Sequence, residues 1–166
     1  NSVNTDWPSL AGQNQKYLYD QLVYFVNGER ENALMTAVIP YLKTLSADEL
    51  LDVAAYYSES SASVGQADSN ADLLALGESL YRAGDLNRGI PACTACHSLY
   101  GEGNIQAGFP KISGQQKGYL ISTLKEYRSQ SRNAGNYALV MQAASANLKD
   151  DDIEALANYM HGLYRK

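Results

Sequence analysis

The sequence of 166 residues predicts an all-α protein made of two tandem copies of one module. Two observations carry this prediction. Apolar residues recur at the i, i+3, i+4 and i+7 spacing of a helix face, and no stretch alternates convincingly as a half-buried strand does. The second half of the chain also repeats a pattern of the first, which indicates a duplicated module. Residues 1–58 and 71–166 are predicted as the two domains, with residues 59–70, rich in Ser, Ala, Gly and Asp, as their linker.

The repeat is clearest in two seven-residue segments. Trp7–Gln13 and Phe109–Gln115 both read aromatic, Pro, polar, aliphatic, small, Gly, Gln. Further along, Leu45–Tyr56 corresponds to Leu148–Tyr159. Between these segments the match continues in equivalent pairs: Tyr17 with Tyr119, Leu18 with Leu120, Leu22 with Leu124, Phe25 with Tyr127 and Arg30 with Arg132.

Two helices are predicted on either side of the linker. Ser46 and Glu49 form the Ser-x-x-Glu pattern of a capping box, which predicts a helix that begins there and runs through Tyr57. After the linker, an apolar stripe predicts a helix over residues 73–81, formed by Leu73, Leu76, Gly77 and Leu80.

Two more helices are predicted in the second half. One covers Tyr119–Tyr127, and the last begins at Asp150–Asp152, whose negative charges suit the positive end of the helix dipole. Gly77 has no side chain, so we expect the last helix to approach its backbone closely near Tyr159. His161 is expected at the surface. The apolar stripe of the last helix, expected in the core, is Ile153, Leu156, Ala157 and Met160.

The motif Cys93-Thr-Ala-Cys96-His97 indicates a covalently attached c-type haem. Each thiol can form a thioether with one vinyl group on the same porphyrin edge. The turn between the thiols brings His97 under the iron, where one ring nitrogen can serve as an axial ligand. Because haem is attached outside the inner membrane in bacteria, we expect an exported protein whose leader has been removed.

Two other kinds of site share part of this pattern. A redox disulfide prefers a preceding strand and a low-pKa thiol at a helix start, but the four residues before Cys93 are Gly-Ile-Pro-Ala. A zinc site needs four ligands as a rule, and the chain has two cysteines and only one further histidine, His161. Haem attachment is therefore the favoured interpretation.

The composition and charge of the chain argue against nucleic-acid binding and against a transmembrane helix. The formal net charge of −5, which haem propionates would make more negative, argues against nucleic-acid binding. No apolar run approaches the roughly 20 residues of a transmembrane helix, although docking to membrane complexes remains compatible with the sequence. An acidic electron carrier is steered towards basic docking surfaces.

The chain resembles the di-haem, tandem-domain class I cytochromes c of the c-four type. The resemblance rests on Gly84-Asp85, on the run Arg88–His97, on Gly101-Glu-Gly-Asn104 and on the Pro-x-hydrophobic-small-Gly-Gln segment of each half. It implies two tandem class I cytochrome c domains, each with one haem, that carry electrons in the periplasm.

The resemblance assigns roles in the second half. It implies thioether bonds at Cys93 and Cys96, His97 as the proximal ligand and Met141 as the distal ligand. It also implies that the carbonyl of Pro110 accepts a hydrogen bond from the other ring nitrogen of His97, which fixes the orientation and basicity of the ligand. Without the resemblance, Met141 is an ordinary core residue and Pro110 a chain turn. Three more residues are candidates for the haem edge: Tyr119, Arg132 and Gln115.

The first half departs from the family pattern because it has no Cys-x-x-Cys-His. Asn1 corresponds approximately to Asn104, so the first domain lacks its N-terminal haem-binding segment in this chain. Either the intact protein carries that segment and a second haem, or the first domain has lost its haem and serves as an interaction surface. We favour the first. An apolar face of Leu50, Val53 and Tyr57 is then expected to stand exposed.

Met35 is the candidate distal ligand for that first haem. It stands ten residues before Leu45, whereas Met141 stands seven before Leu148. The helix or loop after Met35 must therefore accommodate three extra residues. An ordinary buried methionine is the alternative.

The predicted function is electron transfer without catalysis. An iron with two axial ligands has no open position for a substrate. The resemblance implies a quinol-oxidising complex (quinol–cytochrome c reductase) as donor and a terminal oxidase or reductase as acceptor. The alternatives are a haem subunit of a periplasmic oxidoreductase, or a haem enzyme such as a peroxidase or a sulfur-compound oxidase, for which the sequence offers only His161 as a spare acid or base.

Overall fold

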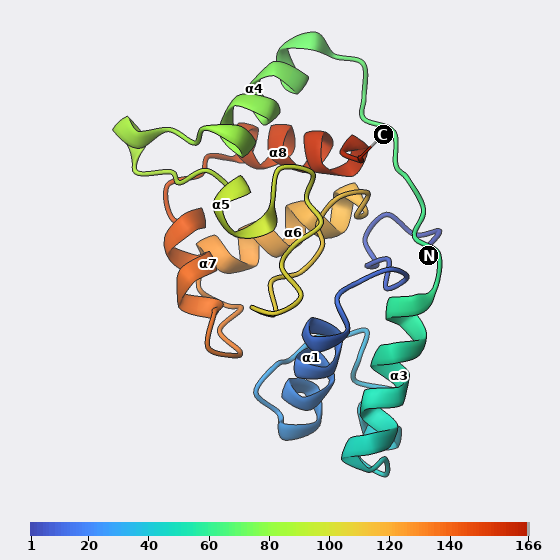
Figure 1. The fold of residues 1–166 in the computed structure, drawn as a ribbon. Helices are drawn as coiled ribbons and strands as arrows, with labels where there is room; N and C mark the ends of the chain where they lie inside the picture. Colours follow the sequence, from blue (N-terminus) through green and yellow to red (C-terminus); the bar gives the residue numbers. More distant parts are fainter. Residues whose placement is uncertain (166) are drawn as a thin grey trace.

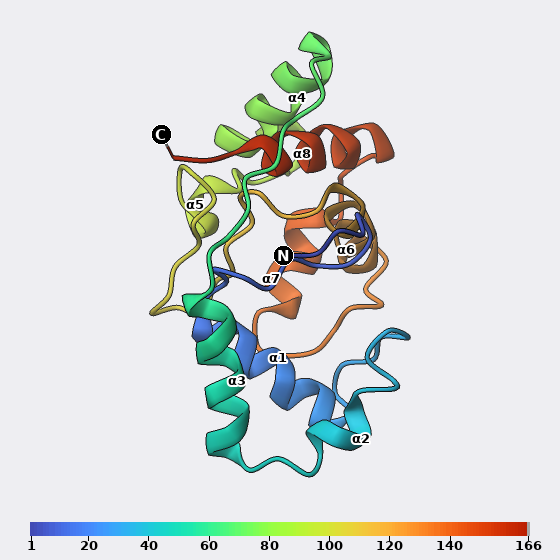
Figure 2. The same cartoon turned by 90° about the vertical axis from the view of Figure 1, so that its right-hand side faces the viewer.

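The computed structural model describes residues 1–165 as helices joined by loops, with no strand in that range. The predicted all-α fold is therefore confirmed. Figure 1 shows the two halves of the chain one above the other, with the connecting segment running down one side, and Figure 2 shows the same arrangement after a quarter turn. None of the helices within the described range combines the length and apolarity that a membrane span needs.

The first half contains helices α1 (Gln15–Asn27), α2 (Ile39–Leu42) and α3 (Ala47–Glu59). The predicted capping box at the start of α3 is present: the Ser46 hydroxyl accepts from the N–H of Glu49, and the Glu49 carboxylate accepts from the N–H of Ser46 at 2.8 Å. Helix α1 packs against α3.

The predicted exposure of one face of α3 is wrong. Leu50 is buried, and Val53 and Tyr57 are half-buried, because α1 covers this side of the helix. The large apolar side chains of α3 that do stand exposed are Leu51 and Tyr56. The stripe of apolar residues indicates that α3 needs a partner, but not that α1 supplies it.

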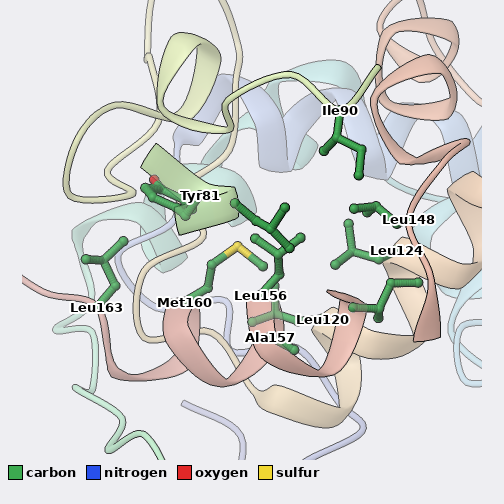
Figure 3. Packing of buried hydrophobic residues seen from close by; sticks show 11 residues of the cluster. Tyr81, Ile90, Leu120, Leu124, Leu148, Leu156, Ala157, Met160 and Leu163 are labelled. Carbon is green, nitrogen blue, oxygen red and sulfur yellow. The ribbon is translucent and has the colours of Figure 1, made fainter. Parts of the chain in front are cut away.

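The second half contains six helical segments as far as residue 165. These are α4 (Ala71–Arg82), the 3₁₀ turn η1 (Leu86–Arg88), α5 (Thr94–His97), α6 (Lys117–Arg128), α7 (Ala138–Ser145) and α8 (Asp150–Gly162). Figure 3 shows the core that these helices enclose. Its members come from α4, α6 and α8 and from the loops around them, and include Leu80, Tyr81, Ile90, Leu120, Leu124, Leu148, Ile153, Leu156, Ala157, Met160 and Leu163.

Helices α4 and α8 approach each other closely at Gly77, as the sequence predicts. A Cβ on Gly77 would meet the carbonyl oxygen of Ala155 and would lie 2.8 Å from the Cβ of Tyr159. A methyl group does not fit between these helices, so glycine is required here. Met160 is buried in the core, as expected.

The two halves are joined by reciprocal hydrogen bonds, in which a glutamine side chain of each half binds a backbone peptide of the other. The side chain of Gln13 accepts from the N–H of Lys111 and donates to its carbonyl, both at 2.7 Å. The side chain of Gln115 makes the same two bonds with the backbone of Ser9, at 2.8 and 3.0 Å. Gln13 corresponds to Gln115 in the repeat, and Ser9 corresponds to Lys111, so each half holds the other in the same way.

Residues 60–70 connect α3 to α4 without a helix. The segment is fastened to the second half, because Asp68 pairs with Lys117 at 2.8 Å and its N–H donates to Asn158 at 2.8 Å. The expectation that His161 lies at the surface is wrong. It is half-buried, its Nδ1 lies 2.8 Å from the carbonyl of Gln115, and it packs against the connecting segment. The predicted domain boundaries at residues 58 and 71 stay a prediction.

Candidate haem site

The Cys93–His97 motif folds as the short helix α5, with the N–H of His97 donating to the carbonyl of Cys93 at 3.0 Å. The loop before it is held by Arg88, which donates to Asp85 at 2.6 Å and makes two bonds to Asp152 on α8, at 2.7 and 3.1 Å. The buried Asp152 carboxylate thereby ties the loop before α5 to α8.

The imidazole of His97 is buried and oriented by one hydrogen bond. Its Nδ1 lies 3.0 Å from the carbonyl oxygen of Pro110. A carbonyl can only accept, so Nδ1 carries the hydrogen and Nε2 keeps its lone pair. Burial lowers the pKa of His97, which keeps the ring neutral at physiological pH and its Nε2 available to a metal.

The Pro110 carbonyl is placed by its neighbours in the chain. Phe109 and Asn104 exchange two backbone hydrogen bonds, at 2.9 and 3.1 Å, which close the loop directly before Pro110. Gly103, at φ +77°, packs directly on Pro110; a Cβ there would lie 2.6 Å from the Pro110 oxygen. The Phe109 ring lies beside the imidazole, with 6.4 Å between the ring centroids.

The two thiols are free and half-buried. Burial raises the pKa of the Cys93 thiol to about 11, so it is protonated at neutral pH. A redox dithiol relies on a lowered thiol pKa, so the redox interpretation is not supported. Within residues 1–165, no three His, Cys, Asp or Glu side chains gather as a metal cluster, so a zinc site is not supported either. Two free thiols beside a neutral imidazole with an unused Nε2 fit a covalently attached haem.

Met141 lies on α7 and is half-buried against the same core cluster that Cys93 contacts. Helix α7 lies below α5 in the views of both Figure 1 and Figure 2. The role of Met141 as the distal ligand stays a prediction.

Met35 lies in the turn before α2 and is half-buried. The turn adjoins a hollow of about 460 Å³, which Met35 does not line. The residues that line it are Phe25, Gly28, Arg30, Glu31, Asn32, Ala33, Thr36, Ile39 and Lys43. The role of Met35 as a haem ligand also stays a prediction.

A cage of tyrosines around Arg132 lies between the halves. The buried guanidinium donates to the hydroxyl of Tyr17 at 2.9 Å and to that of Tyr119 at 3.3 Å. Gln21 accepts from both Arg132, at 3.3 Å, and Arg30, at 2.6 Å. Burial opposes ionisation of Tyr119, but the charges of Arg132 and Arg30 outweigh it and lower the pKa of Tyr119 to about 7. In the sequence, Tyr17 and Arg30 appear as the repeat equivalents of Tyr119 and Arg132, and Gln21 is not singled out. The haem-edge role of Tyr119 and Arg132 stays a prediction.

Comparison with known proteins finds one family and several close relatives. The family model described as cytochrome c matches residues 74–163. Cytochrome c4 of Pseudomonas aeruginosa is 40% identical over 164 residues, which cover 99% of this chain and 79% of that protein. The structure of reduced recombinant cytochrome c4 from Pseudomonas stutzeri is similar with a TM-score of 0.91 and 40% identity, covering 99% of this chain and 88% of that one. A thiosulfate dehydrogenase electron acceptor of Thiomonas intermedia is 35% identical, covering 93% of this chain and 69% of that protein.

Proposed function

This chain belongs to the cytochrome c family and is a haem electron-transfer protein of the tandem-domain c4 type, and we propose that it carries electrons in the periplasm from a quinol-oxidising complex to a terminal oxidase or reductase. The observation that carries the proposal is the buried, neutral His97, whose Nδ1–H is bound by Pro110 while Nε2 is left for a metal.

Each site residue has one task in this proposal. Cys93 and Cys96 would hold the haem covalently, and His97 and Met141 would bind its iron. When bound, the haem supplies a one-electron iron couple. The Pro110 carbonyl keeps the His97 ring in one orientation, and the packed core behind Met141 keeps the thioether in place. With both His97 and Met141 on the iron, no position would be left for a substrate, which is the physical argument for a carrier rather than an enzyme.

Spectroscopy on the purified protein tests the ligand assignment. Methionine coordination predicts the near-infrared sulfur-to-ferric-iron absorption band in the oxidised protein, and resistance to small added ligands such as cyanide. Stopped-flow oxidation by a terminal oxidase, and reduction by a quinol-oxidising complex, test the partners. A protein that lacks the band and binds cyanide at once has an open site and is not the simple carrier proposed.

A second candidate function is that of an electron acceptor for a dehydrogenase of sulfur compounds. The similarity to the thiosulfate dehydrogenase electron acceptor of Thiomonas intermedia favours it. Mixing the oxidised protein with a thiosulfate dehydrogenase and thiosulfate distinguishes the two candidates, since only this one predicts rapid reduction of the haem in that mixture.

We also propose a second haem in the intact protein, attached outside residues 1–59, which contain neither cysteine nor histidine. The repeat supports this, because the first half keeps the Pro-x-hydrophobic-small-Gly-Gln segment of a haem domain. Haem content and intact mass of the product of the full gene decide it, and one haem per chain would rule it out.

A further inference from the structure

The side chain of Gln13, in the first half of the chain, lies next to the haem site of the second half. Its Oε1 accepts from the N–H of Lys111 at 2.7 Å, and its Nε2 donates to the Lys111 carbonyl at 2.7 Å. Asn14 donates to the carbonyl of Phe109 at 2.6 Å. These two buried residues therefore hold the backbone on both sides of Pro110.

One peptide unit connects Gln13 to His97. The carbonyl of Pro110 and the N–H of Lys111 belong to the same planar unit, and the described chain has no cis peptide, so the two groups point in opposite directions. The carbonyl accepts from Nδ1 of His97, and the N–H donates to Oε1 of Gln13. A continuous chain of hydrogen bonds thus runs from Gln13 through the peptide to the imidazole.

Such a chain is cooperative. When the N–H of a peptide is bound by an acceptor, its carbonyl becomes more negative and accepts more strongly, by about 10–30% per bond. A stronger acceptor draws the Nδ1 hydrogen of His97 outward and makes Nε2 more basic. A more basic axial ligand favours the ferric state, and so lowers the reduction potential.

We propose that Gln13 is a positioning residue for the haem of the other domain: by binding the Pro110–Lys111 peptide it fixes the His97 ring, raises the basicity of Nε2 and lowers the potential of the haem. The proposal rests on His97 as an axial ligand. It assigns the contact between the two halves a part in tuning the redox centre as well as in holding the halves together.

The repeat supplies a matched control. Gln115 makes the same two backbone bonds with Ser9 that Gln13 makes with Lys111, but the peptide it binds follows Pro8 rather than Pro110. Gln13→Met and Gln115→Met therefore remove equivalent amides from the same interface, and only the first touches the peptide that binds His97.

Redox titration of the intact haem protein measures the effect. We expect Gln13→Met to change the ratio of reduced to oxidised haem at a fixed potential about threefold in favour of the reduced form, which is an upward shift of about 30 mV for a one-electron couple. Gln115 is a haem-edge candidate in the sequence, but the structure engages both groups of its amide with the backbone of Ser9. Gln115→Met should therefore leave the potential of this haem unchanged. The His97 Nδ1–H resonance in the proton spectrum should move upfield and exchange faster in Gln13→Met alone.

Two further variants complete the test. Gln13→Glu keeps an oxygen acceptor for the N–H of Lys111, although a carboxylate cannot donate to the Lys111 carbonyl. Because its negative charge also favours the ferric state, this variant should not raise the potential. Gln13→Asn, whose shorter side chain withdraws the acceptor, should raise the potential and serves if Gln13→Met does not fold. An unshifted potential of the Cys93–Cys96 haem in Gln13→Met and Gln13→Asn overturns the proposal, and so do equal shifts of the potential of that same haem in Gln13→Met and Gln115→Met. Absence of the low-spin spectrum and of the near-infrared band in the unaltered protein would instead refute the proposed function, and this proposal with it.

Discussion

Replacing Gly77 by alanine tests the close packing of α4 on α8. The new Cβ would lie 2.8 Å from the Cβ of Tyr159 and would meet the carbonyl oxygen of Ala155 even more closely. Carbon atoms in contact prefer about 3.5–4.0 Å, so the two helices must move apart by nearly 1 Å at this point. Both obstacles belong to the backbone or sit directly on it, so no side-chain rotation removes the clash.

The expected cost follows from two opposing effects. Overpacking of a well-packed core costs up to about 3 kcal/mol, and alanine regains about 1 kcal/mol of helix propensity over glycine. We therefore expect Gly77→Ala to lower the free energy of unfolding by about 2 kcal/mol. Leu80 and Tyr81, on the same helix, share the buried core cluster with residues of α8 and would lose part of that packing as the helices separate.

Urea denaturation, followed by circular dichroism, measures this free energy. Ser79→Ala, at an exposed position of the same helix, is the control, because it changes helix propensity without meeting α8. The haem absorption of Gly77→Ala should remain that of a six-coordinate protein at low urea concentration. Equal stability of Gly77→Ala and the unaltered protein would refute the close approach of the two helices.

Three further predictions concern the site and the surface. Met141→Ala should lower the haem potential by a sizeable part of the about 0.8 V range that axial ligands control, and open a site for cyanide; an unchanged potential with the sulfur band retained would identify another ligand. Because the pKa of Tyr119 is lowered to about 7 in the folded protein, its side chain is ionised there between pH 7 and 10, while the unfolded side chain keeps its proton. The free energy of unfolding, measured relative to Tyr119→Phe, should therefore rise by up to about 1.4 kcal/mol per pH unit in this range. A difference in unfolding free energy between the two proteins that stays constant from pH 6 to 9 contradicts this. The net charge of −5 predicts slower electron transfer to a basic partner as salt is added, and a salt-independent rate excludes steering by charge.

Local signals in the sequence predicted local structure well. The capping box at Ser46 lies where the Ser-x-x-Glu pattern placed it, because its partners are three residues apart. The approach of α8 to Gly77 was predictable too, since a glycine in the middle of an apolar stripe leaves space that a neighbouring helix can enter. The bond between His97 and Pro110 followed from the family resemblance rather than from the spacing of the two residues.

Contacts between the halves were not predictable. Gln13 binds Lys111 and Gln115 binds Ser9 across about a hundred residues of chain, and no local pattern specifies which residues meet at that separation. The same holds for Arg132, whose buried position depends on Tyr17 of the first half. The repeat did mark each of these residues as one of an equivalent pair, which is the only trace in the sequence of their shared surroundings.

The reciprocal glutamine contacts have a consequence for the origin of this chain. In a homodimer with twofold symmetry, residue i of one subunit meets residue j of the other, and j of the first meets i of the second. Positions 9 and 13 meet positions 115 and 111 in that pattern here, although both sets lie on one polypeptide. The interface is thus isologous, as expected if the ancestor was a single-domain protein that dimerised before its gene was duplicated and fused.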